Sequence, residues 1–273
     1  MDEAAVGRLA GINWADWYRR WERQQGGYIS EREARFGAMF SAVAHFLGEE
    51  FVAVDVASGP GGLTRRLAER FPKARVFAVD LDPVLLAIGR QAVGAFEGRV
   101  TWVQADLNDP NWVRTLPVTH VDAALSTTAI HWLSTGSIAE LYRTLADLIG
   151  PGGVFADGDQ MRFPPSRPAL RTFAEATRAW HRDSARAAGV ESWEEWWSAL
   201  RQEAALGELF AERDRLFAWR GDVDRNIGSR IASGPSVVHT GYELHRAALT
   251  EAGFGEVETI WQHLDDRLLL AIR

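Results

Sequence analysis

A glycine-rich turn near residue 60 carries the first sign of ligand chemistry in this sequence. It follows a short apolar run and reads Asp55-Val-Ala-Ser-Gly59-Pro-Gly61-Gly62. Glycines at a strand-to-helix turn let the backbone approach a ligand closely, at the crevice where doubly wound sheets bind their ligands. Asp55 adds negative charge, so the turn suits a cationic ligand better than a pyrophosphate. A tight turn without a ligand is the alternative interpretation.

Two carboxylates end the next two apolar runs. Asp80 ends the second run and Asp106 ends the third. One carboxylate can accept two hydrogen bonds from a vicinal diol, and Asp80 is the candidate for that role. The alternative for Asp80 is to cap a helix that begins near Pro83, a role that Asp82 suits better. The alternative for Asp106 is a turn with residues 108–110.

Histidine and tryptophan supply the remaining candidates. His131 follows the fourth apolar run, where a neutral imidazole can take a proton from an acceptor, and simple packing is its alternative. Trp193, Trp196 and Trp197 have the spacing of one helical face, which indicates packing. An aromatic cavity for a planar or cationic acceptor stays open as the other interpretation. The seven histidines are scattered, so no metal site is predicted.

Short apolar runs alternate with helical patterns along most of the chain. Helices are expected at about 62–71, 83–94, 137–149 and 241–252. Strands are expected at 51–57, 75–80, 99–106, 121–128 and 154–159, followed by a hairpin of 256–264 and 265–273. This alternation predicts an α/β fold: a doubly wound, mostly parallel, seven-stranded sheet whose last strand is antiparallel.

The amino-terminal segment predicts two helices before the sheet. Trp14, Trp17, Tyr18 and Trp21 share one helical face, and the sequence GlnGlnGlyGly at 24–27 is expected to end that helix and to act as a hinge. A capping box of Ser30 and Glu33 then predicts a helix from about residue 31 to residue 46.

Four segments follow from these patterns. Residues 1–49 are expected to form a helical lead or lid, 50–164 an α/β core, 165–240 an inserted helical cap, and 241–273 the end of the core. The cap segment shows no strand pattern, carries Trp180 and Trp219, and ends in a Gly/Ser/Pro-containing stretch at 227–235.

Composition excludes several classes. The 30 Lys and Arg against 37 Asp and Glu give a net charge of −7, which argues against a nucleic-acid partner. The absence of Cys excludes disulfides, thiolate zinc sites and Cys nucleophiles. No apolar run approaches the ~18 residues of a membrane span, and the start of the chain is too acidic for a signal peptide. A cytoplasmic protein is therefore expected.

The motifs taken in order resemble those of class I S-adenosylmethionine-dependent methyltransferases, in the small-molecule group that includes trans-aconitate methyltransferase-like proteins. Asp55-x-Ala57-x-Gly59-x-Gly61 is similar to the acidic-x-Gly-x-Gly-x-Gly loop of the family, with Ala57 replacing the first Gly. Ala fits any position with negative φ, so this departure is expected to be mild. The segments 126–132 and 150–153 also match the family in order and spacing, and the resemblance covers about residues 30–164 and 241–273.

The resemblance implies a Rossmann-like fold, S-adenosyl-L-methionine as cofactor, and metal-independent O- or N-methylation of a small-molecule acceptor. It implies that Asp80 binds the ribose hydroxyls, that Asp106 accepts from the adenine amine, and that Arg35 reaches the methionine carboxylate, with Arg32 as the alternative. His131 is the candidate catalytic residue. The full set of implied cofactor-binding residues is Tyr28, Arg35, Asp55, Ala57, Gly59, Gly61, Asp80, Leu81, Asp106, Leu107 and Ser126.

Two other functions stay open at this point. A nicotinamide-dependent oxidoreductase is disfavoured because Thr64 stands where the dinucleotide fingerprint has Gly or Ala, and because the chain has no Tyr-x-x-x-Lys. A non-catalytic S-adenosylmethionine-binding module is the second alternative. The sequence names neither the acceptor nor the oligomeric state.

Overall fold

The fold is built on one seven-stranded sheet with strand order β3-β2-β1-β4-β5-β7-β6. The computed structural model describes residue 9, residues 11–218 and residues 241–273. Trp219 and the stretch 227–235 therefore lie outside the described residues. The strands are Val52–Val56 (β1), Arg75–Asp80 (β2), Val100–Gln104 (β3), Val121–Thr127 (β4), Ile149–Gln160 (β5), Glu256–His263 (β6) and Asp266–Ile272 (β7).

The pairing confirms the predicted fold class. Strands β3, β2, β1, β4 and β5 pair in parallel, whereas β7 runs antiparallel to both β5 and β6. The glycines at 150–153 are expected to precede the fifth strand. In the structure they lie inside β5 instead. There Ile149 already pairs with Val121, and the register shifts before the pair of Val154 with Ala123.

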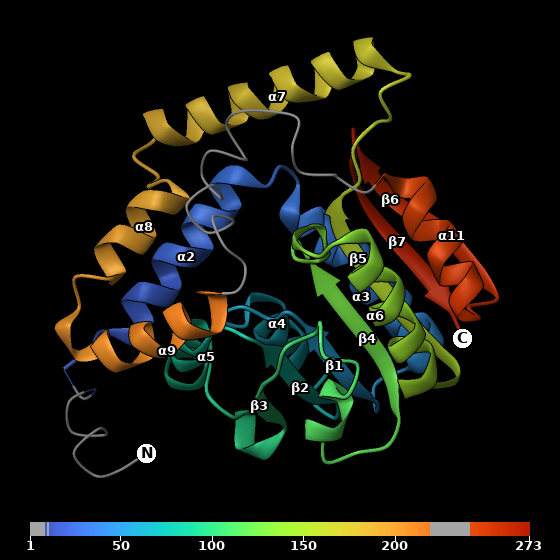
Figure 1. Ribbon diagram of the computed structural model, residues 1–273, viewed down its shortest axis with the longest axis horizontal. Helices are drawn as coiled ribbons and strands as arrows, with labels where there is room; N and C mark the ends of the chain where they lie inside the picture. Colours follow the sequence, from blue (N-terminus) through green and yellow to red (C-terminus); the bar gives the residue numbers. More distant parts are fainter. Residues whose placement is uncertain (1–8, 10, 219–240) are drawn as a thin grey trace.

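Helices cover both faces of the sheet (Figure 1). The α-helices of the described chain are Trp14–Tyr28 (α2), Arg32–Leu47 (α3), Gly62–Arg70 (α4), Pro83–Ile88 (α5), Thr135–Leu148 (α6), Pro168–Ala187 (α7), Trp193–Leu200 (α8), Gly207–Phe217 (α9) and Tyr242–Ala252 (α11). A π-helical turn, Gly89–Val93, extends α5, so the expected helix at 83–94 is present in two parts.

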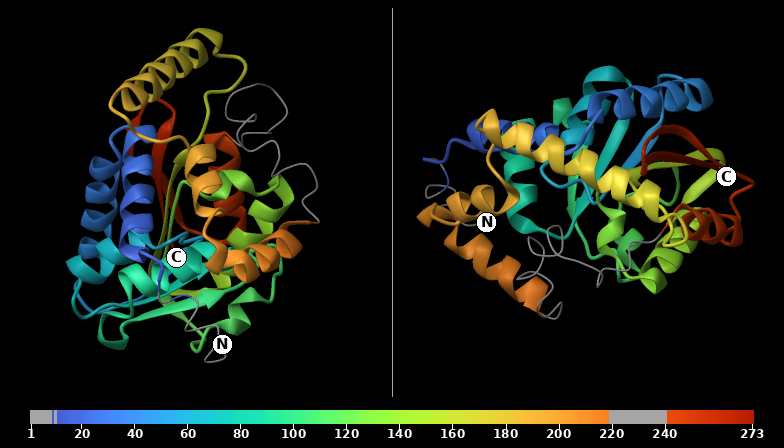
Figure 2. Two further views of the ribbon diagram at one scale, coloured as in Figure 1. Left: turned by 90° about the vertical axis from the view of Figure 1, so that its left-hand side faces the viewer. Right: turned by 90° about the horizontal axis from the view of Figure 1, so that it is seen from above.

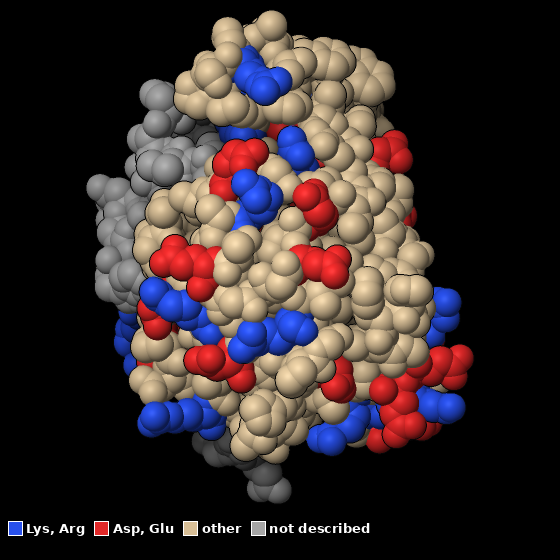
Figure 3. Space-filling view, turned by 90° about the vertical axis from the view of Figure 1, so that its right-hand side faces the viewer, with Lys and Arg blue, Asp and Glu red and all other residues tan. Residues whose placement is uncertain are grey.

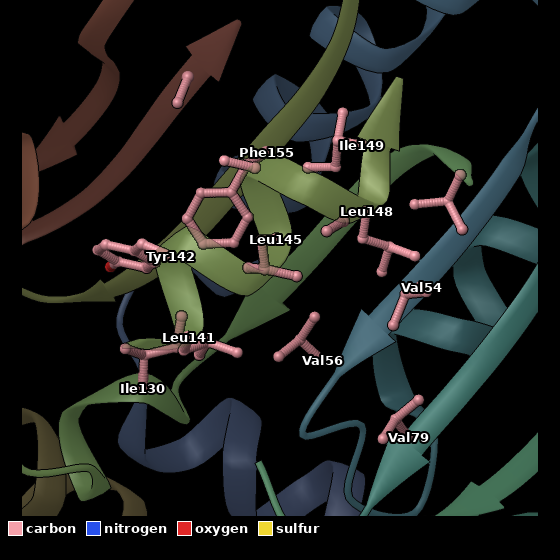
Figure 4. Packing of buried hydrophobic residues seen from close by; sticks show 14 of the residues in the cluster. Val54, Val56, Val79, Ile130, Leu141, Tyr142, Leu145, Leu148, Ile149 and Phe155 are labelled. Carbon is pink, nitrogen blue, oxygen red and sulfur yellow. The ribbon is translucent and has the colours of Figure 1, made fainter. Parts of the chain in front are cut away.

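Two apolar layers hold these helices on the sheet. On one face, Val54, Val56 and Phe155 pack against Leu141 and Leu145 of α6, as Figure 4 shows. On the other face, α3 and α4 pack against alternate residues of the same strands, because neighbouring strand residues point to opposite faces. Helix α3 is thus part of the sheet packing, although it lies in the segment expected to form a lead or lid.

Both predicted amino-terminal helices are present, but the predicted break at 24–27 and the predicted capping box are wrong. Helix α2 continues through residues 24–27 to Tyr28. A Cβ at Gly27 would lie 2.9 Å from Cγ1 of Val190, so this glycine lets α2 approach the segment after α7 closely. The capping box is also absent: Glu31 begins α3 without a side-chain cap, and Glu33 instead pairs with Arg66 at 2.6 Å.

Helices α7, α8 and α9 follow β5 and precede α11 in the chain. In Figures 1 and 2, α7 crosses the molecule above the sheet, and α8 and α9 lie beside α2 and α5. Trp196 of α8 packs against Trp17 and Trp21 of α2, with ring centroids 6.0 and 4.9 Å apart. The tryptophans therefore form an apolar core that joins α2 to α8.

The distribution of charged side chains on the surface is consistent with the counts of basic and acidic residues in the sequence. On the face shown in Figure 3, basic and acidic side chains are interspersed and do not form a continuous basic track. Within the described residues, no helix combines the length and apolar character that crossing a membrane requires.

Candidate functional site

A cavity of about 1450 Å³ lies where the parallel strands end. Its floor comes from the turns after β1, β2, β3, β4 and β5, and its walls come from α2, α7 and α8. Strands β1 and β4 are neighbours at the centre of the sheet although β2 and β3 separate them in sequence. In open α/β sheets, such a switch point at the carboxyl ends of the strands is where ligands bind.

The turn after β1 takes a left-handed backbone at three positions. Gly59 and Gly61 have φ angles of +55° and +88°, and Ala57 has a φ of +58°. The expectation that Ala57 fits with a negative φ is wrong, since this position uses a conformation that costs an L-residue with a Cβ about 1–2 kcal/mol. Two constraints require glycine at position 61. One is its positive φ, and the other is that a Cβ there would lie 2.4 Å from Cη2 of Trp102.

Asp80 lines the cavity at the end of β2 and is fixed by backbone donors. Its Oδ2 accepts from the N–H of Gly59 and its Oδ1 from the N–H of Asp82, both at 2.8 Å. Burial raises the pKa of Asp80 to about 6. Each carboxylate oxygen has a second acceptor position, so the side chain can still accept one hydrogen bond through each oxygen. Asp82 caps α5, as expected, by accepting from Val84 and Leu85.

Asp106 both stabilises a turn and lines the cavity. Its Oδ1 accepts from the N–H of Asn108 at 2.9 Å and from Nδ2 of the same residue at 2.8 Å, so the turn alternative is present. Asp106 nevertheless lines the cavity together with Leu107 and Leu81. No described residue donates a hydrogen bond to its Oδ2.

Asp55 and Ser126 lie beneath the cavity rather than on its wall. Oδ2 of Asp55 accepts from the N–H of Thr64 at 2.9 Å and from the Thr64 hydroxyl at 2.6 Å, and burial raises the pKa of Asp55 to about 7. The Ser126 hydroxyl donates to the carbonyl of Val56. These side chains brace the turn after β1, and neither is among the residues that line the cavity.

Arg35 also differs from its expected position. Its guanidinium is 1 % exposed, donates to Asp266 at 2.7 Å, and donates to the hydroxyls of Thr127 and Thr128 at 2.7 Å each. These bonds direct Arg35 to the loop after β4, and the residue does not line the cavity. Arg32 does line it, and it pairs with Glu22 through two hydrogen bonds of 2.9 and 3.0 Å.

His131 lines the cavity in the loop after β4 and contacts a carboxylate behind it. Its Nδ1 lies 2.7 Å from Oδ1 of Asp159, and its backbone N–H donates to Oδ2 of the same residue at 3.1 Å. Burial alone would raise the pKa of Asp159, but His131 and the backbone N–H groups of His131 and Gln160 lower it to about 2. Nothing in the spacing of residues 131 and 159 predicts their contact, so sequence reasoning did not find Asp159 as the partner of His131.

Sequence reasoning missed a row of arginines above the site. Arg162 lines the cavity, and α7 adds Arg171, Arg178, Arg182 and Arg186 from a single helical face. Burial and then Arg178 lower the pKa of Arg162, whereas Asp265, which pairs with Arg178, acts in the opposite direction. The helical spacing of these four α7 arginines is the signal that predicts the row from sequence.

Aromatic side chains complete the walls. Trp193 and Trp197 line the cavity, as do Trp21, Tyr28 and Trp132, so part of the tryptophan cluster borders the space in which a ligand would lie. The described residues contain no group of three or more His, Asp or Glu side chains arranged to hold a metal ion.

Comparison with known proteins gives consistent matches. Residues 53–153 match a family model described as a methyltransferase domain. The chain is 33 % identical over 175 residues to a trans-aconitate 2-methyltransferase of Azoarcus sp., a match that spans 63 % of this chain and 61 % of that protein. It is 31 % identical over 234 residues to a trans-aconitate 2-methyltransferase of Paracidovorax citrulli, spanning 84 % of this chain and 73 % of that protein.

The fold is also found in solved structures. DesVI of Streptomyces venezuelae superposes with a TM-score of 0.56 at 15 % identity, covering 96 % of this chain and 98 % of that one. A putative S-adenosyl-L-methionine-dependent methyltransferase of Methanococcus maripaludis gives a TM-score of 0.51 at 15 % identity, covering 95 % and 93 % of the two chains. The family match and the Paracidovorax relative lead to one conclusion: the chain belongs to the class I S-adenosylmethionine-dependent methyltransferases.

Proposed function

We propose that the protein transfers the methyl group of S-adenosylmethionine to a small-molecule acceptor that carries carboxylate groups. One observation carries the choice of acceptor: the arginines of α7 and Arg162 line the same cavity as Asp80 and the glycine turn. Arginine binds carboxylates in a bidentate geometry that lysine does not reproduce. The name of the relatives, trans-aconitate 2-methyltransferase, supports a carboxylate acceptor of this kind.

The floor of the cavity offers carboxylate acceptors that suit the hydrogen-bond donors of the cofactor. Asp80 accepts from the two ribose hydroxyls through the free acceptor position of each oxygen, and Asp106 accepts from the adenine amine beside Leu107 and Leu81. The turn that contains Ala57 and Gly59 brings the backbone close to the methionine end. When bound, S-adenosylmethionine supplies an electrophilic methyl group on a positively charged sulfur.

Arg32 replaces Arg35 in this proposal as the partner of the methionine carboxylate. Arg32 lines the cavity at the start of α3, whereas the guanidinium of Arg35 is already bonded to Asp266 and to two threonines. Glu22 holds Arg32 from the side of α2. Tyr28, at the end of the same helix, closes the cofactor end of the cavity.

The inserted segment provides the acceptor site. Residues 50–164 and 241–273 form the cofactor-binding core in this proposal, and α7 covers the acceptor with its arginine face. Methyl transfer is an in-line displacement, so the protein contributes chiefly proximity and alignment. Trp193 and Trp197 add flat walls that favour a planar or aromatic acceptor.

Turnover with carboxylate acceptors tests the proposal. Purified protein is incubated with isotopically labelled S-adenosylmethionine and a panel of planar carboxylic acids, including trans-aconitate, beside the corresponding amides. We expect methylated acids and no methylated amides. Tight binding of S-adenosylhomocysteine without turnover of any acid would instead support the non-catalytic binding module.

Arginine variants locate the acceptor. We expect Arg162→Gln and Arg182→Gln to raise the KM for the acid about tenfold or more, the scale of a lost charge-assisted hydrogen bond, while the Kd for S-adenosylhomocysteine stays constant. The matched control is Arg143→Gln, which removes an exposed arginine of α6 paired with Glu140. An unchanged KM in both cavity variants contradicts the proposed acceptor site.

A further inference from the structure

Glu22 of α2 is the centre of a charge network beside the glycine turn. Its Oε1 accepts from Nη2 of Arg32 at 2.9 Å, and its Oε2 accepts from Nη1 of Arg32 at 3.0 Å and from Nη1 of Arg66 at 2.7 Å. Burial alone would raise the pKa of Glu22, but the two arginines lower it, so the carboxylate is ionised. Three helices meet at this carboxylate, because Arg32 belongs to α3 and Arg66 to α4.

Gly62, the first residue of α4, provides the space for this network. A Cβ at Gly62 would lie 2.6 Å from Oε1 of Glu22 and 2.8 Å from Nη2 of Arg32. The carbonyl of Gly62 also accepts from Nη1 of Arg66 at 2.8 Å. The pair of Glu22 and Arg32 therefore packs directly on the residue that follows the left-handed part of the turn.

The guanidinium of Arg32 keeps donors for a ligand. It has five N–H donors and uses two of them on Glu22, and within the described chain the other three donate to no residue. Because Glu22 occupies both terminal nitrogens, the edge formed by Nε and one terminal nitrogen is left for a second carboxylate. Arg32 lines the cavity, whereas Glu22 and Arg66 do not, so of these three side chains Arg32 is the one that contacts a ligand there.

Arg66 offsets the charge that Glu22 brings to the site. The two arginines carry two positive charges against the single negative charge of Glu22, so one positive charge is left at Arg32. Without Arg66, the charges of Glu22 and Arg32 would cancel. Arg66 also pairs with Glu33, but that side chain is 69 % exposed, so water and salt screen its charge from the cavity. Both guanidinium groups lie over the ring of Phe36, at 5.1 and 4.8 Å from its centroid, which restricts their positions.

We propose that Glu22 and Arg66 are positioning residues for the cofactor: Glu22 orients Arg32, and Arg66 compensates the charge of Glu22. Arg32 then binds the methionine carboxylate through its free edge. This inference rests on the proposed function, in which Arg32 is the partner of that carboxylate. It makes the carboxylate a determinant of specificity, because an adenosine thioether that lacks it gains no affinity from the three side chains.

Two ligands separate the network from the rest of the cofactor site. S-adenosylhomocysteine carries the carboxylate, whereas methylthioadenosine has the same adenosine and sulfur without the amino-acid end. Calorimetry at pH 7.5 and low salt gives both Kd values for the full chain. We expect Arg66→Gln to raise the Kd of S-adenosylhomocysteine about three- to tenfold, the scale of one charge interaction at a partly buried site, and that of methylthioadenosine by no more than about twofold. The matched control is Arg65→Gln, which removes the neighbouring arginine of α4, paired with Glu69 on the surface, and should change neither Kd.

A double variant distinguishes charge compensation from mechanical support. Glu22→Gln combined with Arg66→Gln removes one charge of each sign, and the glutamine amide oxygen at position 22 still accepts from Arg32. We expect this double variant to bind S-adenosylhomocysteine about threefold more tightly than Arg66→Gln alone. If the two residues served only to join α2 to α4, the double variant would bind no better than the single one, and that result would overturn the proposal.

Gly62→Ala displaces the pair without removing a charge. The added Cβ meets the ends of two flexible side chains and no backbone, and alanine favours a helix, so we expect equal or higher stability in urea. We nevertheless expect a higher Kd for S-adenosylhomocysteine and an unchanged Kd for methylthioadenosine. The matched control is Gly37→Ala in α3, where a Cβ would have no neighbour within 4 Å, and it should change neither Kd.

The outcomes separate this inference from the proposed function. Equal losses of affinity for the two ligands in Arg66→Gln would overturn it, because the network would then act on the fold or on the adenosine site. Unchanged binding of S-adenosylhomocysteine in Arg66→Gln and in Gly62→Ala would also overturn it and would leave the proposed methyl transfer intact. Failure of the unaltered chain to bind either ligand would contradict the proposed function itself. If the unaltered chain binds S-adenosylhomocysteine but no methylthioadenosine, the double variant decides.

Discussion

The backbone N–H of Gly59 donates a 2.8 Å hydrogen bond to Oδ2 of Asp80. This bond ties the turn after β1 to the end of β2, so the residue proposed to hold the ribose and the turn proposed to approach the methionine end are fixed relative to each other. Because desolvation raises the pKa of Asp80 to about 6, the charge proposed to bind the diol is itself sensitive to pH.

Affinity for S-adenosylhomocysteine is therefore expected to depend on pH. The hydroxyls of the ligand prefer the ionised carboxylate, so the affinity is full above about pH 7 and falls as the pH drops through 6, approaching tenfold per unit below it. Calorimetric titrations at pH 5, 6 and 7.5 measure the change. The matched control is Asp80→Asn, whose weaker affinity should lack this component, and the same slope in that variant would assign the pH dependence to another group.

Ala57→Gly is expected to stabilise the protein by about 0.5–1 kcal/mol. Glycine takes the φ of +58° without the cost that alanine incurs, and this gain exceeds the extra freedom of glycine in the unfolded chain. Urea unfolding gives the free energy. The control, Ala42→Gly within α3, should instead lose about as much, and a loss of stability in both variants would contradict this account of the turn.

Trp196→Ala is expected to destabilise the fold by about 3–5 kcal/mol. Trp196 is 1 % exposed and joins α8 to α2, so its removal leaves a cavity between them. Trp180→Ala is the control, because that side chain is 69 % exposed and should change the stability by no more than about 0.5 kcal/mol. Equal losses in chemical denaturation would show that the tryptophan cluster is not the core of this junction.

The sequence predicts the fold well because buried parallel strands leave a local pattern. The strands around Val54 and Val79 are apolar on both faces, and each ends where a glycine or an aspartate begins the cavity. The residues at these ends, among them Asp80 and Asp106, have positions that follow directly from strand length. Sequence reasoning therefore finds the floor of the cavity.

The sequence predicts less where the outcome depends on contacts between distant segments. Gly26 and Gly27 are helix breakers locally, yet α2 continues because Gly27 fits against Val190. Arg35 points to Asp266, which is 231 residues away in the chain, and so it does not reach the cavity. The contact of His131 with Asp159 depends in the same way on the register of β4 against β5.

The acceptor site could not be predicted from the sequence for a different reason. The arginines of α7 share a helical face, but the sequence does not show whether that face points to solvent or to the cofactor. These arginines line the cavity, and α7 crosses above the sheet (Figure 2). On this basis we propose a carboxylate acceptor.

Binding of S-adenosylhomocysteine to the unaltered chain and to Asp80→Ala tests the central claim most directly. Isothermal titration calorimetry at pH 7.5 should give a micromolar Kd for the unaltered chain. The Asp80→Ala variant should lose about 1.5–3 kcal/mol, the scale of hydrogen bonds to a charged group. Asp109→Ala, which removes a nearby turn aspartate that does not line the cavity, should bind as the unaltered chain does. An equal Kd for the unaltered chain and Asp80→Ala would contradict the account.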